Sequence, residues 1–143
     1  MDYKLFSLSI LTPEKEFMIG EAAEVIFSTP EGRVGVMSGH APMIASVSAG
    51  VMEVHMDGVW KIAAVGQGFA EIAYGNAEFY LDTAEWAGDI DSVRAKDALD
   101  RAERRIRSNL TKQEYLRTQA AISRALARLK AAASYSAAPG NDR

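Results

Sequence analysis

The side chains that most often perform catalysis are scarce in this sequence. The 143 residues include two histidines, His40 and His55, and no cysteine. Neither histidine has a second candidate ligand at the spacing of zinc or iron sites, and the lack of cysteine excludes thiolate metal sites, disulfide scaffolds and cysteine nucleophiles. His55 alternates with apolar residues in a strand pattern, which indicates a structural or surface role. We therefore predict no metal site.

Other motifs that could support chemistry are incomplete. The serines near the predicted strands lack the G-x-S-x-G pattern of a nucleophile elbow. Residues 66–68, Gly-Gln-Gly, lack the Lys-Ser/Thr of a phosphate-binding loop and lead into a strand, which indicates a turn or bulge. Glu14 and Glu16 lie beside a proline, where a solvated turn explains them better than an acid/base pair. These observations disfavour an enzyme.

The composition indicates a globular chain with two electrostatically different parts. Hydrophobic residues make up 48% and charged residues 24%, as in folded domains. No apolar run reaches the roughly 18 residues that span a bilayer, and the N-terminus resembles neither a signal nor a transit peptide. Residues 1–93 carry four basic and fourteen acidic residues, a net charge of −10, whereas residues 94–143 carry twelve and five, a net charge of +7. We expect the two parts to face different surroundings.

Short strands dominate residues 1–86. Apolar and polar residues alternate in runs such as residues 6–10, and turn signals separate the runs. Asp57-Gly58 lies between two such runs and is a strong hairpin signal, and Gly75-Asn76 is a second hairpin candidate. Many short strands at roughly ten-residue spacing predict an antiparallel sandwich or barrel rather than βαβ units.

The pattern changes to that of helices after Trp86. Residues 89–107 contain neither Gly nor Pro and are rich in helix formers, and Asp89 or Asp91 can cap the first turn. After a break at residues 108–109, a capping box begins a second helix. The box consists of Thr111 and Glu114, and the apolar stripe of the second helix consists of Ile122, Leu126, Leu129 and Ala133.

Two helices joined by a short turn predict an antiparallel hairpin. Its expected seam is rich in alanine: Ala95, Ala98 and Ala102 on one helix, and Ala120, Ala121, Ala125 and Ala132 on the other. A buried leucine stabilises by about 1.5–3 kcal/mol and an alanine methyl by only about 0.8 kcal/mol. We therefore expect a hairpin that docks weakly and is mobile.

These patterns together predict an α+β fold with an N-terminal antiparallel β-sandwich followed by a C-terminal antiparallel α-helical hairpin. The expected boundaries are residues 1–86 for the sandwich, 87–135 for the hairpin and 136–143 for a disordered tail.

Residues 31–42, E-G-R-V-G-V-M-S-G-H-A-P, closely resemble the signature of the epsilon subunit of bacterial F-type ATP synthases, the homologue of the mitochondrial delta subunit. The family pattern is roughly E-G-x-x-G-[IV]-x-x-G-H-A-P with a later glycine, here Gly50. Three further segments are similar to family motifs in the same order: residues 66–72, 81–84 and 89–91. The resemblance extends from about residue 3 to residue 133.

The resemblance implies a non-catalytic rotor subunit. In the family, the sandwich binds the gamma subunit and the c ring of the proton-translocating enzyme. The helical hairpin folds against the sandwich, or extends along gamma toward the alpha and beta subunits and blocks ATP hydrolysis. The +7 segment suits the acidic regions that the beta subunits present. The implied location is peripheral, on the cytoplasmic face of the bacterial plasma (inner) membrane.

The signature segment implies a contact with gamma and the c ring. Its residues are Glu31, Arg33, Ser38, Gly39, His40, Ala41 and Pro42. Pro42 stiffens this loop and Gly39 allows a tight turn, so that an exposed imidazole could donate a hydrogen bond. The alternative is a loop histidine without a partner. Arg33 departs from the family, in which this position is more often acidic or small.

Residues 90–95, I-D-S-V-R-A, match the [IL]-D-x-x-R-A pattern of epsilon subunits that bind ATP in the folded hairpin. The implied ligands are Ile90, Asp91, Arg94, Ala95, Arg101, Arg124 and Arg128. Helical spacing permits this, because residues seven or four apart share a face. The alternative is a solvated basic face that contacts acidic partners. Regulatory ATP is the one ligand that the resemblance implies, and no cofactor is expected.

Two other classes of function remain open on residue patterns alone. A carbohydrate-binding or other small-molecule-binding sandwich with a helical lid would need a concave aromatic patch, but aromatic residues make up only 8% and are scattered. A nucleic-acid binder could use the basic hairpin, but the acidic sandwich and the lack of aromatic residues between the arginines disfavour it. We therefore expect protein partners and no nucleic acid.

Overall fold

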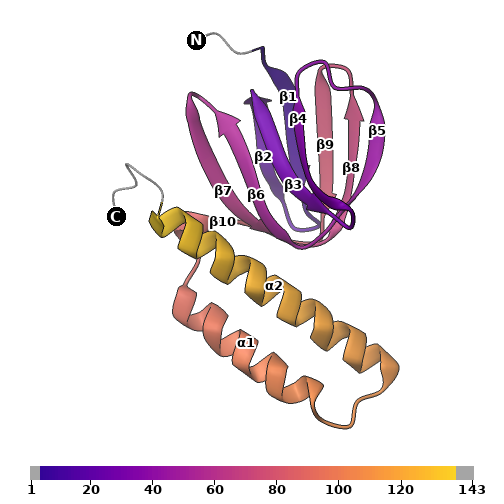
Figure 1. Ribbon diagram of the computed structural model, residues 1–143, viewed down its shortest axis with the longest axis vertical. Coiled ribbons are helices and arrows are strands. Elements are labelled where there is room, and N and C mark those ends of the chain that lie inside the picture. The colour runs from indigo at the N-terminus through magenta and orange to yellow at the C-terminus, as the bar shows by residue number, and fades with distance from the viewer. Residues whose placement is uncertain (1–3, 138–143) are drawn as a thin grey trace.

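The computed structural model describes residues 4–137, which form a two-sheet β-sandwich and a helical hairpin at one end of it (Figure 1). The strands are β1 (Phe6–Leu11), β2 (Glu16–Ala22), β3 (Glu24–Thr29), β4 (Gly32–Met37), β5 (Met43–Val47), β6 (Gly50–Met56), β7 (Val59–Val65), β8 (Gly68–Ala73), β9 (Asn76–Leu81) and β10 (Ala84–Trp86). A 3₁₀ turn η1 (Ala87–Asp89) leads to α1 (Ser92–Ile106) and α2 (Lys112–Ala137). The predicted fold class is confirmed.

The ten strands form two sheets of five. Sheet A has the order β2-β1-β9-β8-β5 and sheet B the order β10-β7-β6-β3-β4. All pairs are antiparallel except β1 with β9, which is parallel. Local patterns do not reveal this pair, because its strands are separated by most of the sandwich sequence. Successive turns lie at alternate ends of the sandwich. The loops before and after β4, which contain the signature residues, are therefore at opposite ends.

The core lies between the sheets, and in strands such as β1, β8 and β9 it uses every second residue. Phe27 of sheet B meets Phe79 of sheet A edge to face, with ring centroids 5.0 Å apart. The other large side chains that are fully buried are Leu8, Ile10, Met52, Val25, Val36 and Val54. Each contributes about 1.5–3 kcal/mol of hydrophobic stabilisation, so the sandwich has a core of its own.

Both predicted hairpins form, one of them in a different register. Asp57 and Gly58 take positive φ angles of 53° and 76°, as a two-residue turn between β6 and β7 requires. Between β8 and β9 the turn residues are Tyr74 and Gly75, because Asn76 pairs with Ala73. The turn is therefore one residue earlier than predicted.

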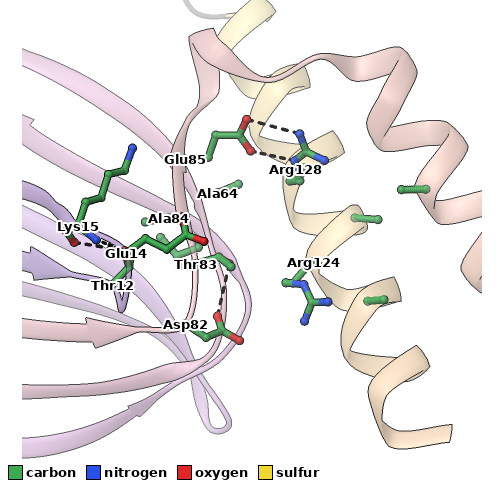
Figure 2. A pocket seen from close by; sticks show the side chains of 14 residues that line it. Thr12, Glu14, Lys15, Ala64, Asp82, Thr83, Ala84, Glu85, Arg124 and Arg128 are labelled. Atoms are coloured by element: carbon green, nitrogen blue, oxygen red, sulfur yellow. Dashed lines mark hydrogen bonds and ion pairs between the residues drawn. The ribbon is translucent and has the colours of Figure 1, made fainter. Parts of the chain in front are cut away.

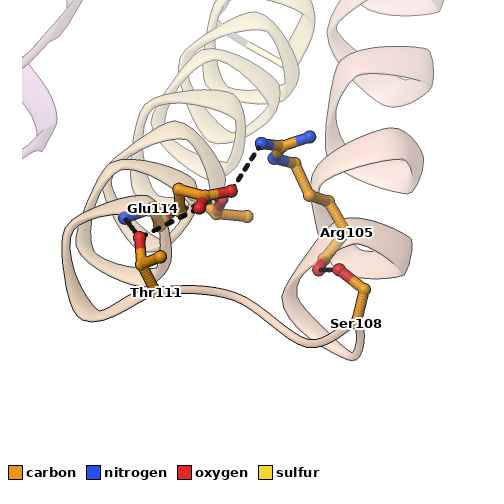
Figure 3. A network of polar contacts seen from close by, with 5 residues as sticks. Arg105, Ser108, Thr111 and Glu114 are labelled. Carbon is orange, nitrogen blue, oxygen red and sulfur yellow. Dashed lines mark hydrogen bonds and ion pairs between the residues drawn. The ribbon is translucent and has the colours of Figure 1, made fainter.

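The predicted helix starts are confirmed in detail. The Asp91 carboxylate accepts hydrogen bonds from the backbone N–H groups of Val93 (3.1 Å) and Arg94 (3.2 Å). At the start of α2 the Glu114 N–H donates to the Thr111 hydroxyl (3.1 Å), which donates to the Glu114 carboxylate (3.0 Å; Figure 3). Arg105 of α1 reaches the same carboxylate at 3.3 Å and joins the two helices.

Helix α2 is longer than expected. It continues to Ala137, so residues 136 and 137, assigned to a tail above, are helical, and residues 138–143 lie outside the described residues.

Helix α2 buries four of its alanines, leaves the predicted seam residues Ala120 and Ala121 half-buried, and exposes part of the predicted apolar stripe. The predicted seam residues Ala95, Ala102, Ala125 and Ala132 are buried. Ala127 and Ala131 pack against Ala64 and Ala87 of the sandwich side. Leu126 in contrast is 47% exposed. The helix lies between α1 and sheet B, and small side chains allow a close approach to both.

Candidate functional site

The signature residues lie at two ends of the sandwich. Glu31 lies in the turn before β4, and Arg33 is the second residue of β4. Residues 38–42 form the loop that follows β4. An extended strand of six residues spans about 20 Å. The motif is therefore contiguous in sequence but not a single cluster in space.

Arg33 binds along the surface of its own sheet. Its guanidinium donates to the Ser28 hydroxyl (3.0 Å), to the Val51 carbonyl oxygen and to the Glu53 carboxylate (3.1 Å). These contacts join the edge strand β4 to β6 across β3. Arg33, which we expected to differ from the family pattern, thus contributes to the integrity of sheet B.

The loop at His40 is held by local hydrogen bonds. Gly39 has φ +86°, and the His40 N–H donates to the Met37 carbonyl at 3.2 Å. The imidazole Nδ1 lies 2.7 Å from the carbonyl oxygen of Ala41. A carbonyl only accepts, so Nδ1 carries the proton, and the neutral ring offers Nε2 as an acceptor. The ring N–H of this tautomer is thus used within the loop rather than offered to a partner.

Three of the four predicted arginines converge. Arg94 and Arg101 of α1 and Arg128 of α2 line one open pocket of about 450 Å³ together with Asp97 and Ala98. Arg94 and Arg101 share a helix face, and the antiparallel α2 brings Arg128 opposite them. Three guanidinium groups around one pocket suit a phosphorylated or carboxylate ligand.

Arg124 lines a neighbouring pocket of about 550 Å³ between hairpin and sandwich, which Arg128 also lines (Figure 2). Glu85 of β10 binds Arg128 there, with carboxylate oxygens 2.9 Å from Nε and 3.4 Å from Nη2. The two side chains are 31% and 34% exposed. A pair as exposed as this contributes no more than about 1 kcal/mol.

The other predicted nucleotide ligands have structural contacts. Asp91 caps α1, Ile90 packs against the alanine cluster under α2, and Ala95 is fully buried. Among the described residues, none of these three lines either arginine pocket. Their contribution to a site would require a local rearrangement.

Glu85 has no sequence signal of its own. It lies 43 residues from Arg128, and only the docking of α2 brings them together. In the part of the chain from residue 4 to 137, no three His, Asp or Glu side chains are grouped as metal ligands would be. No helix within these residues is long and apolar enough to cross a membrane.

Two family models match consecutive parts of the chain. The model described as ATP synthase, Delta/Epsilon chain, beta-sandwich domain matches residues 5–87, and the model of the long alpha-helix domain matches residues 89–133. The ATP synthase epsilon chain of Ruminiclostridium cellulolyticum is 43% identical over 126 residues, which cover 88% of this chain and 94% of the relative. That of Caldanaerobacter subterraneus subsp. tengcongensis is 38% identical over 133 residues, 92% and 96% of the two chains.

A solved structure supports the same fold. A chain in the cryo-EM structure of the Euglena gracilis mitochondrial ATP synthase superposes with a TM-score of 0.78 at 20% identity, over 93% of this chain and 84% of that one. With the two domain models covering nearly all of the described residues, the chain belongs to the delta/epsilon chain family of ATP synthases.

Proposed function

We propose that this chain is a non-catalytic central-stalk subunit whose sandwich couples gamma to the c ring and whose hairpin inhibits ATP hydrolysis. The relatives are ATP synthase epsilon chains, and the similar fold comes from a complex of F1 with its c ring. In this role the chain is peripheral to the cytoplasmic face of the bacterial plasma membrane and has no active site.

The observation that carries the regulatory role is the way in which α2 meets the sandwich. The fully buried centre of this contact consists of four alanines, Ala64, Ala87, Ala127 and Ala131, and larger side chains pack around it only partly buried: Val51, Ile62, Ile90 and Tyr135. The salt bridge Arg128–Glu85 adds little. Releasing the hairpin thus breaks a contact whose fully buried part is made of alanines, and the sandwich keeps its separate core.

We expect the released hairpin, which is basic, to bind acidic surfaces of the catalytic subunits. The segment from residue 94 onward carries a net charge of +7, so the acidic regions expected on the beta subunits would attract it over about 8 Å at physiological salt. An extended hairpin could then block the rotation that hydrolysis requires.

Deletion of residues 89–143 tests this role. We expect assembly and ATP synthesis to stay largely intact, and ATP hydrolysis by the membrane enzyme to rise. Pull-down of the deletion variant should still recover gamma and c subunits. Loss of gamma and c from the pull-down would contradict the coupling role, and unchanged hydrolysis would contradict the inhibitory one.

We propose regulatory ATP as the ligand of the arginine pockets, with Arg94, Arg101, Arg124 and Arg128 binding the phosphates. Isothermal titration of the full chain with MgATP should show binding that Arg94→Gln weakens. Arg107→Gln is the matched control, because Arg107 is the C-cap residue of α1 and lines neither pocket. Absence of heat at millimolar MgATP would exclude the nucleotide and favour a basic face for acidic partners.

A further inference from the structure

The hairpin is joined to the sandwich by a short linker, residues 87–90, which lies between two fixed points. Before the linker, the Trp86 ring packs on Phe17 with ring centroids 4.5 Å apart, and the ammonium group of Lys61 lies 5.7 Å from the Trp86 centroid. After the linker, the Asp91 carboxylate caps α1. A movement of the hairpin that keeps both parts folded must therefore change backbone angles within residues 87–90.

The linker is buried under helix α2. Ala87 is 3% exposed and belongs to one cluster with Ala127 and Ala131 of α2, and Ile90 packs against the same cluster. The Ile90 N–H donates to the Ala87 carbonyl oxygen at 3.2 Å and closes the 3₁₀ turn η1. Because its apolar side chains lie beneath α2, the linker cannot change its conformation without breaking this packing.

Tyr135, in the last turn of α2, covers the middle of the linker. Figure 1 shows this end of α2 beside β10. A Cβ atom at Gly88 would lie 3.1 Å from Cζ and from the hydroxyl oxygen of Tyr135, and 3.4 Å from its Cε2. Gly88 is not among the glycines with positive φ, so its backbone angle would also suit an alanine. The close approach of the Tyr135 ring is therefore what favours glycine at this position.

Tyr135 differs from the α2 alanines of this contact in size and in position. It brings a half-buried aromatic ring to the cluster in which Ala127 and Ala131 contribute only methyl groups. A ring buries more apolar area than a methyl group and stabilises the contact more. The last turn of a helix can also fray while the preceding turns stay formed. Tyr135 can thus leave the linker while the rest of α2 is still docked.

We propose that Tyr135 is a latch on the linker, and that release of the hairpin begins at the C-terminal turn of α2 rather than at the turn between the helices. This inference rests on the proposed release of the hairpin and assigns its first step to one contact. With the ring over Gly88, the linker is held and the hairpin stays docked. Once the ring has left, residues 87–90 can change their backbone angles and let both helices move as a unit.

Hydrogen exchange of the full chain tests the latch at the Ile90 amide, whose hydrogen bond to Ala87 breaks when the linker opens. Tyr135→Ala should raise the exchange rate of this amide about tenfold or more, because the ring no longer covers the linker. Amides of β1 and β9 should keep their protection, which shows that the sandwich remains folded.

Tyr115→Ala is the matched control for this measurement. Tyr115 lies near the start of the same helix and is 44% exposed, so its removal should leave exchange at Ile90 unchanged. Equal exchange rates at Ile90 in the wild type and Tyr135→Ala would overturn the proposal. The same acceleration in Tyr115→Ala would overturn it too, because release would then not begin at the C-terminal turn.

A double-mutant cycle tests the contact between the ring and the linker. In the wild-type background the methyl group of Gly88→Ala must displace the Tyr135 ring, so exchange at Ile90 should accelerate. In the Tyr135→Ala background the same methyl group meets no ring. Gly88→Ala should there leave the exchange rate unchanged or lower it, because alanine restricts the open linker more than glycine does. The same effect of Gly88→Ala in both backgrounds would overturn the contact on which the latch depends.

ATP hydrolysis by the assembled enzyme separates the latch from the inhibitory role. Easier release should lower hydrolysis in Tyr135→Ala, which is the opposite of the rise expected when residues 89–143 are deleted. Faster exchange at Ile90 with unchanged hydrolysis would support the latch and contradict the inhibitory role of the released hairpin. Lower hydrolysis with unchanged exchange would overturn the latch, because Tyr135 would then act away from the linker.

Discussion

The sandwich and the hairpin are stabilised by different kinds of packing. Two phenylalanines and several large aliphatic side chains fill the space between the sheets, whereas the fully buried residues between α2 and the sandwich are alanines, with larger side chains only partly buried around them. Hydrophobic stabilisation is roughly proportional to buried apolar area. From this comparison we expect one part of the molecule to be a rigid body and the other to be an arm that can detach while the first stays folded.

The largest effect should follow from emptying the sandwich core. Phe27→Ala removes a fully buried ring that contacts Phe79, and we expect a loss of about 3–5 kcal/mol in the free energy of unfolding. Urea denaturation measures it. Tyr74→Ala, at a 72% exposed ring, should change stability by less than about 0.5 kcal/mol. Equal losses of unfolding free energy in the two variants would mean that the sandwich core does not dominate the stability.

The next largest effect should come from a glycine in sheet A. A Cβ atom at Gly68 would lie 1.9 Å from the carbonyl oxygen of Tyr80, a backbone atom that cannot move without separating β8 from β9. Gly68→Ala should therefore destabilise by about 1–3 kcal/mol in thermal unfolding. At Gly20 the nearest atom is a flexible methionine methyl at 3.3 Å. Gly20→Ala should cost clearly less, and a reversed order would contradict the packing described.

Overpacking the α2 contact should release the hairpin without unfolding the sandwich. Ala131 is fully buried against the sandwich, whereas Ala133 is exposed. Ala131→Leu should weaken docking by about 1–3 kcal/mol and make α1 and α2 sensitive to limited proteolysis. Ala133→Leu should leave both parts resistant. Loss of sandwich protection in Ala131→Leu would show that the two parts unfold together.

The smallest effect should come from the ion pair between β10 and α2. Glu85→Gln removes the partner of Arg128 at a half-exposed site, so docking should weaken by no more than about 1 kcal/mol, and less at high salt. The rate of limited proteolysis of the hairpin, compared between the wild type and Glu85→Gln at low and at high salt, measures this weakening of docking. A loss of several kcal/mol would mean that the salt bridge, rather than the alanine contact, holds the hairpin.

Local signals predicted local structure well. Asp57-Gly58, Asp91 and Thr111 with Glu114 act through residues at most three positions away, and all form as expected. Such interactions depend on chain geometry that the sequence specifies directly.

Strand register and long-range strand pairing could not be predicted from such local signals. The second hairpin has the right turn region, but its strands are shifted by one residue relative to a Gly75-Asn76 turn. A one-residue shift changes every cross-strand partner, so the adjacency of Glu71 and Glu78 could not be predicted. The parallel β1–β9 pair and the contact of Glu85 with Arg128 depend on tertiary folding.

The candidate site was predicted in part for the same reason. Helical spacing brings Arg94 and Arg101 to one face, and the expected hairpin adds Arg128. The predicted apolar stripe of α2 is only partly buried: Ile122 and Leu129 are half-buried and Leu126 is 47% exposed, while Ala127 and Ala131 pack against the sandwich. Helix α2 lies between α1 and sheet B and presents small residues to both. A search for one apolar stripe assumes a helix with a single buried face, so it does not describe α2.

Native-state hydrogen exchange on the full chain tests most directly the claim that a rigid sandwich carries a detachable hairpin. Amides of β1 and β9 should exchange only through global unfolding, whereas amides of α1 and α2 should open with a free energy several kcal/mol lower. The deletion of residues 89–143 should leave the protection of β1 and β9 nearly unchanged. Equal opening free energies for helices and strands would show a single cooperative unit and contradict the account.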